Sequence, residues 1–130
     1  MIFGFFAKNP SKEARQLTKD VTKIIEMVEQ TYRPELLAEI ARITRDGIEQ
    51  IVTRCGEDAS CRARELDRYK SLHREARRQN SQGGLTAYTL IIINLRAAAL
   101  GEVGLPVVAL IEQFLERWPG QVKPVDTLAG

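Results

Sequence analysis

Apolar residues recur every three or four positions along most of this chain, the spacing that places side chains on one face of an α-helix. Prolines and glycines interrupt the pattern where helices would end. We therefore expect an all-α fold, a single-domain bundle of about five helices. The pattern places these helices at approximately residues 11–30, 34–55, 59–79, 86–100 and 106–118.

The first two predicted helices are separated by a short break before Pro34. The ring of Pro34 disfavours helical backbone in Arg33 and presets the first turn of the next helix. We therefore expect a tight turn and an antiparallel hairpin of two helices. Gly47, inside the second helix, would let a neighbouring element approach closely.

The third and fourth predicted helices differ in polarity. Residues 59–79 carry many charges and a thin apolar stripe, so this helix should be the most exposed. Residues 86–100 are apolar almost all round, which predicts the core helix. A buried strand at residues 91–93 is the alternative, because three consecutive isoleucines favour sheets. Between the two helices, residues 80–84 predict a flexible Gly-rich loop.

The length of 130 residues suits one domain, and 44% hydrophobic with 28% charged residues is ordinary for a globular protein. Residues 1–120 should form the bundle, and residues 121–130, which lack periodicity, a loosely ordered C-terminal tail. The formal net charge is only +2, with both signs interspersed. This overall charge does not favour binding to nucleic acid or to an anionic membrane.

No segment predicts a membrane anchor or a cleaved leader. The longest apolar stretch, residues 85–100, contains Asn94 and Arg96 and is too short for a bilayer, so no membrane insertion is expected. Residues 1–8 are apolar but lack a preceding basic region and a cleavage site, so they should be retained. Two cysteines are too few to hold a domain of this size together, and we expect a cytoplasmic location.

The sequence contains no arrangement of residues typical of an enzyme. A Gly-rich phosphate loop, a nucleophile elbow and a Ser/His/Asp set are all missing. The single histidine, His73, is a candidate general base, and a partly buried structural histidine is the alternative. One histidine argues against a histidine-rich zinc site. We expect no catalytic residues, no metal site, no cofactor and a non-enzymatic function.

Cys55 and Cys61 are the candidate redox pair of the chain. They flank the connection between the second and third predicted helices, where a disulfide forms if their Cα atoms come within about 7 Å. Cys61 lies beside Arg62 near a helix N-terminus, a position that favours a reactive thiol. In a cytosolic protein, two free thiols are the expected state.

Basic residues gather toward the end of the third predicted helix: Lys70, Arg74, Arg77 and Arg78. Together with the Gly-rich loop they form a candidate site for the phosphates of nucleic acid or for another anionic ligand. The alternative is that these cations only suit the C-terminal end of a helix.

Polar residues of the core helix are candidate contacts to a small molecule, together with His73. Asn94 and Arg96 lie in an otherwise apolar helix, where polar groups need partners. Those partners are either a ligand or the acids Glu102 and Glu112. We expect a ligand-binding face where the third helix, the Gly-rich loop and these polar residues meet.

The sequence favours a protein-interaction or self-associating structural module, with a homodimer or another protein as the partner. This hypothesis rests on apolar residues near both ends of the chain, which commonly find a partner surface: Ile2, Phe3, Phe5, Phe6, Phe114 and Trp118. The alternative is that both ends close the core of a monomer. Nucleic-acid or anionic-ligand binding through the third helix and its loop is the second hypothesis.

Overall fold

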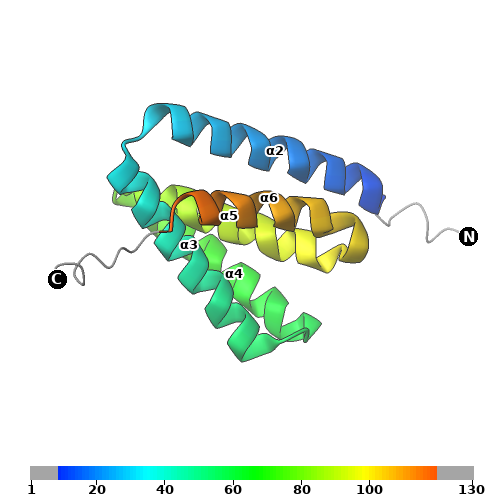
Figure 1. Cartoon of the computed structure of the whole chain (residues 1–130). Coiled ribbons are helices and arrows are strands. Elements are labelled where there is room, and N and C mark those ends of the chain that lie inside the picture. Colours follow the sequence, from blue (N-terminus) through cyan, green and yellow to red (C-terminus); the bar gives the residue numbers. More distant parts are fainter. Residues whose placement is uncertain (1–8, 120–130) are drawn as a thin grey trace, which may run out of the picture.

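The computed structural model describes residues 9–119 of the chain (Figure 1). Within this range there is no strand, and the helices are α2 (Pro10–Thr31), α3 (Pro34–Cys55), α4 (Ala59–Arg78), α5 (Gln82–Ala99), the 3-10 helix η1 (Gly101–Gly104) and α6 (Leu105–Arg117). The predicted all-α bundle of about five helices is therefore confirmed. The alternative of a strand at residues 91–93 is wrong, because these residues lie inside α5. The apolar residues 1–8 and the expected tail, 121–130, lie outside the described residues.

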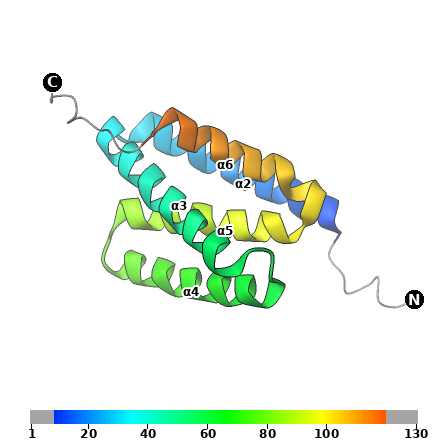
Figure 2. The same cartoon turned by 60° about the horizontal axis from the view of Figure 1, so that its bottom comes forward.

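α5 is the central helix of the bundle, as its apolar sequence predicted. It contacts α2, α3, α4, η1 and α6. Figure 2 shows α5 between the layer formed by α2 and α6 and the outer helix α4, while α3 crosses obliquely. Leu90, Ile91 and Ala97 of α5 are completely buried. The main core cluster joins residues of α2, α3, α5 and α6, and a smaller cluster joins α3, α4 and α5.

Side-chain caps fix the starts of three helices. The Asn9 side chain accepts hydrogen bonds from the backbone amides at the start of α2, and Asp58 and Ser81 do the same for α4 and α5. Each cap satisfies a backbone N–H that has no partner within the helix. α3 begins at Pro34 without a side-chain cap, and because proline has no N–H, its first turn has one amide fewer to satisfy.

The predicted antiparallel hairpin of the first two helices is wrong. α2 packs along α5 and α6, whereas α3 packs against α4, α5 and α6. Figure 1 shows α2 and α3 diverging from the turn that joins them. Tyr32 and Arg33 both have extended backbone, so the chain makes an open corner instead of folding back on itself. The apolar stripe of α2 is therefore covered by α5 and α6.

The predicted Gly-rich loop is also wrong in its extent. α5 already begins at Gln82, so Gly83 and Gly84 are buried residues of its first turn. A Cβ at Gly84 would lie 3.3 Å from Ala76 Cβ of α4, which shows how closely the two helices approach. The glycines predicted a flexible loop, but in the structure they allow α4 and α5 to pack closely.

Gly47 has the role that the sequence predicted. A Cβ at this position would lie 2.5 Å from Ile91 Cδ1 and 3.0 Å from the Tyr69 hydroxyl. The missing side chain thus allows α3 to pack closely on α5. Gly104 is more restricted still, because its Cβ would lie 1.9 Å from the carbonyl oxygen of Ala97. This contact brings η1 directly against the end of α5.

α4 is the charged outer helix that the sequence predicted. Its buried residues are only Glu65, Tyr69 and Ala76. Glu65 is nearly buried and is held by Arg54 at 3.1 Å and Arg68 at 3.4 Å. The pairing satisfies a carboxylate that would otherwise be costly to bury. α4 is thus fixed by a thin stripe and a charged cluster.

The C-terminal end of α6 is fixed by polar contacts. Trp118 Nε1 and Arg117 Nε each donate to Glu29 Oε2 at 2.8 Å, and Arg45 donates to the backbone oxygens of Leu115 and Trp118. Phe114 is fully buried and Trp118 packs against the main core cluster. These two residues close the core of the described fold, as the alternative interpretation of the last helix stated.

Candidate functional site

Four of the predicted ligand-binding residues line one hollow between α2, α4 and α5, with a volume of about 480 Å³. Its aliphatic wall consists of Leu17, Ile24, Ile92 and Ile93, and its basic side chains are Lys23, Lys70, His73, Arg74 and Arg96. We call it the cationic hollow. The predicted meeting of the third helix with the polar residues of the core helix is therefore observed for part of the set. The Gly-rich segment takes no part in lining it.

The charges of the cationic hollow are poorly compensated. Lys23, Lys70, Arg74 and Arg96 form no salt bridge with any described carboxylate. Asp20 is the one acidic residue in the lining, and its carboxylate accepts a hydrogen bond from Gln16 Nε2 at 2.9 Å. The lining of the hollow thus combines four side chains that are positively charged at pH 7 with a single carboxylate and an aliphatic surface.

His73 belongs to this hollow and is partly buried. Burial, helped by the charge of Arg77, lowers the pKa of the imidazole from its ordinary value. The ring is therefore neutral at pH 7. A neutral imidazole offers one donor and one acceptor but adds no charge to the four cations.

The other predicted ligand-binding residues lie elsewhere. Arg77 and Arg78 are exposed at the end of α4, outside the hollow, and Arg78 pairs with Glu75. Asn94 lies on another side of α5. Lys23 was missed, because the wrong partner was predicted for α2 and no sequence signal connected its outer face with α4.

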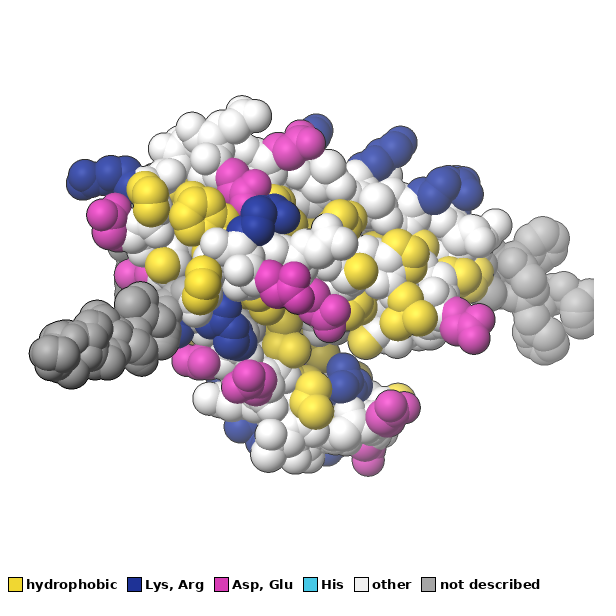
Figure 3. All heavy atoms as spheres, viewed as in Figure 1, with side chains coloured by type: hydrophobic (Ala, Val, Ile, Leu, Met, Phe, Trp, Pro, Cys, Tyr) yellow, Lys and Arg dark blue, Asp and Glu magenta, His cyan; other side chains and the backbone are white. Residues whose placement is uncertain are grey.

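A larger hollow, of about 1220 Å³, is lined by residues of α3, α4, α5, η1 and α6 and by Glu13 of α2. Its apolar lining includes Ile48, Val52, Leu66, Leu105, Val108 and Leu115. Figure 3 shows hydrophobic side chains on both sides of a depression between the lower lobe, which holds the ends of α3 and α4, and the upper body. We call this hollow the apolar groove.

Two aliphatic side chains in the walls of the apolar groove are exposed to solvent over more than half of their surface. Val52 of α3 is 53% exposed and Leu105 of α6 is 59% exposed. Asn94 also lines the groove, and Arg96 borders both hollows. Among the described residues, Asn94 and Arg96 have no side-chain hydrogen bond or salt bridge, so the alternative pairing with Glu102 or Glu112 is not formed.

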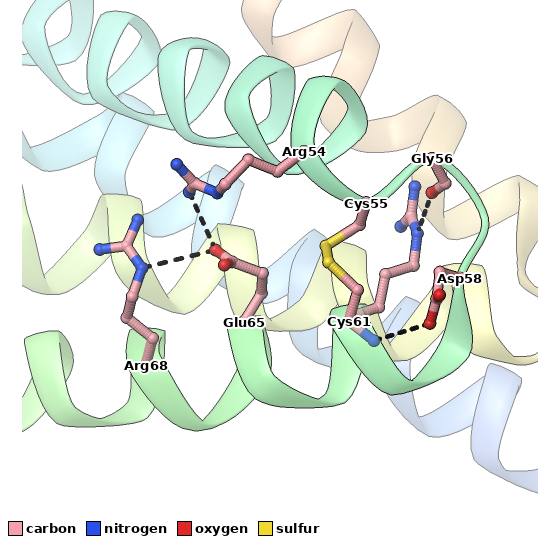
Figure 4. Close-up of a disulfide and its surroundings, with 8 residues drawn as sticks. Arg54, Cys55, Gly56, Asp58, Cys61, Glu65 and Arg68 are labelled. Carbon is pink, nitrogen blue, oxygen red and sulfur yellow. Dashed lines mark hydrogen bonds and ion pairs between the residues drawn. A yellow bond between two sulfur atoms is a disulfide. The ribbon is translucent and has the colours of Figure 1, made fainter.

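Cys55 and Cys61 form a disulfide with a Cα to Cα distance of 5.4 Å (Figure 4). The expectation of two free thiols is therefore wrong. The end of α3 and the start of α4 come close because the Asp58 carboxylate caps α4 at the Cys61 amide and Arg62 Nε donates to the Gly56 carbonyl oxygen at 2.7 Å. The bond fixes the junction of the two helices at one end of the apolar groove.

Neither a metal site in the described part of the chain nor a similar known protein indicates what the two hollows bind. Residues 9–119 contain no group of three or more His, Cys, Asp or Glu side chains that could hold a metal ion. None of the helices in the same range is long and apolar enough to cross a membrane. No protein-family model matches the sequence, and no curated protein or solved structure is significantly similar to the chain.

Proposed function

We propose that this protein is a self-associating interaction module, in which the apolar groove of one copy binds the N-terminal apolar segment, residues 1–8, of a second copy. The observation that carries the proposal is the convergence of Val52 and Leu105 on one groove from two different helices. Single exposed aliphatic residues are common on protein surfaces, whereas several around one concave surface mark interaction sites.

The composition of residues 1–8 suits such a groove. Ile2, Phe3, Phe5 and Phe6 give four large apolar side chains within eight residues. Aromatic side chains are enriched in the buried centres of interfaces, where they fill apolar surfaces. Fully extended, a segment of this length spans about 26 Å, enough to follow a groove between helices.

The position of the segment supports exchange between two copies. Residues 1–8 join the described fold at the start of α2, and Glu13 of the first turn of α2 lines the apolar groove. Asn9, the last described residue before α2, has extended backbone, which Pro10 favours. Exchange of an identical segment produces a closed twofold dimer at low energetic cost.

The mass of the full chain in solution tests this function. We expect a dimer for the wild type and a monomer for Val52→Asp combined with Leu105→Asp, because a buried carboxylate opposes an apolar contact. Met27→Asp is the matched control, since Met27 of α2 is 50% exposed but lies outside the groove. This control should remain a dimer. A wild type that is monomeric at 100 μM would refute the proposed function.

A further inference from the structure

We propose that the cationic hollow between α2, α4 and α5 binds a small organic anion that has one acidic group and an aliphatic part. This site is separate from self-association, because the hollow and the apolar groove share only Arg96 among their lining residues, although α2, α4 and α5 contribute to both. The proposed dimer contact does not require an anion in the cationic hollow.

The charges of the hollow indicate the acidic group. Lys23, Lys70, Arg74 and Arg96 come from three different helices, and each lacks a salt bridge with a described carboxylate. Elsewhere on α4, Arg68 and Arg78 are paired with Glu65 and Glu75, whereas Arg64 and Arg77 also lack a salt bridge with a described carboxylate. The hollow is therefore distinguished by the convergence of four unpaired cations on one concave surface. Uncompensated cations that converge on one concave surface raise the local concentration of anions. The two guanidinium groups also suit a carboxylate, which they can bind through two parallel hydrogen bonds.

The floor of the hollow indicates the aliphatic part. Leu17 and Ile93 are almost completely buried beneath it, while Ile24 and Ile92 remain partly exposed. A bare inorganic anion would leave this surface in water, whereas an alkyl chain would cover it. The volume of about 480 Å³ lies within the range of pockets that hold small molecules.

The cations of the hollow suit a small anion better than an extended polyanion such as nucleic acid. Arg77 and Arg78 at the end of α4 do not line the hollow, and Arg78 is paired with Glu75. Asp20 adds a negative charge to the lining at its α2 side. A phosphate backbone needs a row of cations along its path, and here the cations surround a single small surface.

Titration of the full chain with octanoate, followed by calorimetry and by backbone amide chemical shifts, tests the inference. We expect saturable binding, with shifts concentrated at Ile92, His73 and Arg74. Acetate, which lacks the alkyl chain, and 1-octanol, which lacks the charge, should each bind at least tenfold more weakly. Equal binding of acetate and octanoate would overturn the inference, as would the absence of saturable octanoate binding at millimolar concentration.

Two matched double variants separate the hollow from general charge. Arg74→Gln with Arg96→Gln should weaken octanoate binding at least tenfold, and Arg64→Gln with Arg78→Gln, which removes the same charge outside the hollow, should leave it unchanged. All four side chains are exposed, so both variants should fold, which circular dichroism checks. An equal loss in the two variants would refute the site. So would tight binding of a random DNA duplex in place of octanoate.

Discussion

Trp118 Nε1 donates a hydrogen bond of 2.8 Å to the Glu29 carboxylate, which joins the end of α6 to the end of α2. Arg117 donates to the same oxygen at the same distance. Residues nearly ninety positions apart are thus connected at the point where the described chain ends. The carbonyl oxygens of Leu115 and Trp118 at the same helix end accept hydrogen bonds from Arg45.

Loss of the Glu29 charge should destabilise the fold in a pH-dependent way. Burial would raise the pKa of this carboxyl group, but the hydrogen bonds from Arg117 and Trp118 and the charge of Arg117 outweigh it, so the pKa is lowered. A lowered pKa in the folded state contributes stability above the ordinary carboxyl pKa, and this contribution disappears as the pH falls through the folded-state pKa. Glu29→Gln should therefore lower the free energy of unfolding by about 1 to 2 kcal/mol at pH 7.

Urea unfolding of both proteins between pH 7 and pH 2.5 checks this expectation. The difference between wild type and Glu29→Gln should shrink in the acid range, because protonated Glu29 also lacks the charge. A difference that stays constant down to the lowest pH would show that the charge of Glu29 has no part in stability.

Gly47→Ala should destabilise the protein by about 1 to 3 kcal/mol, although alanine is the better helix former. The added methyl group would lie 2.5 Å from Ile91 Cδ1. Ile91→Val removes that Cδ1 atom, so Gly47→Ala should cost less when it is combined with Ile91→Val. A double-mutant cycle of unfolding free energies measures the coupling. Strict additivity, or a stabilising Gly47→Ala, would contradict the close packing of α3 on α5.

Reduction of the Cys55–Cys61 disulfide should lower the free energy of unfolding by about 2 kcal/mol, as expected for a short closed loop. Thiol titration of the folded, unreduced protein should detect no reactive thiol, and reduction should expose two. The variant with Cys55→Ser and Cys61→Ser is the control and should have the same stability with and without reductant. Two reactive thiols in the unreduced protein would contradict the bond.

Local signals in the sequence predicted the helices well. The second predicted helix, 34–55, has the same bounds as α3, because Pro34 suits only a first turn and Gly56, with φ of 53°, suits a helix end. The partners of each helix were harder to predict. The apolar stripe of α2 predicts that one side of the helix is covered, but it does not identify the helix that covers it. The predicted hairpin with α3 was therefore wrong.

The same limit applies to the candidate site. Lys70, His73 and Arg74 lie within two turns of α4, so their common face follows from helical spacing alone. Lys23 belongs to a helix whose packing was mispredicted, and it could not be assigned to the hollow. Likewise, the cysteine spacing did not decide between thiols and a disulfide, because the 5.4 Å Cα separation depends on the turn between α3 and α4.

Mixing two monomeric variants tests the central claim, exchange of residues 1–8 between copies, most directly. One variant, Phe3→Ser with Phe5→Ser, keeps the apolar groove, and the other, Val52→Asp with Leu105→Asp, keeps the segment. Exchange predicts that each variant is monomeric alone and that their mixture forms a 1:1 heterodimer through one intact contact, detected by sedimentation velocity. A mixture that stays monomeric at concentrations where the wild type is dimeric would contradict segment exchange.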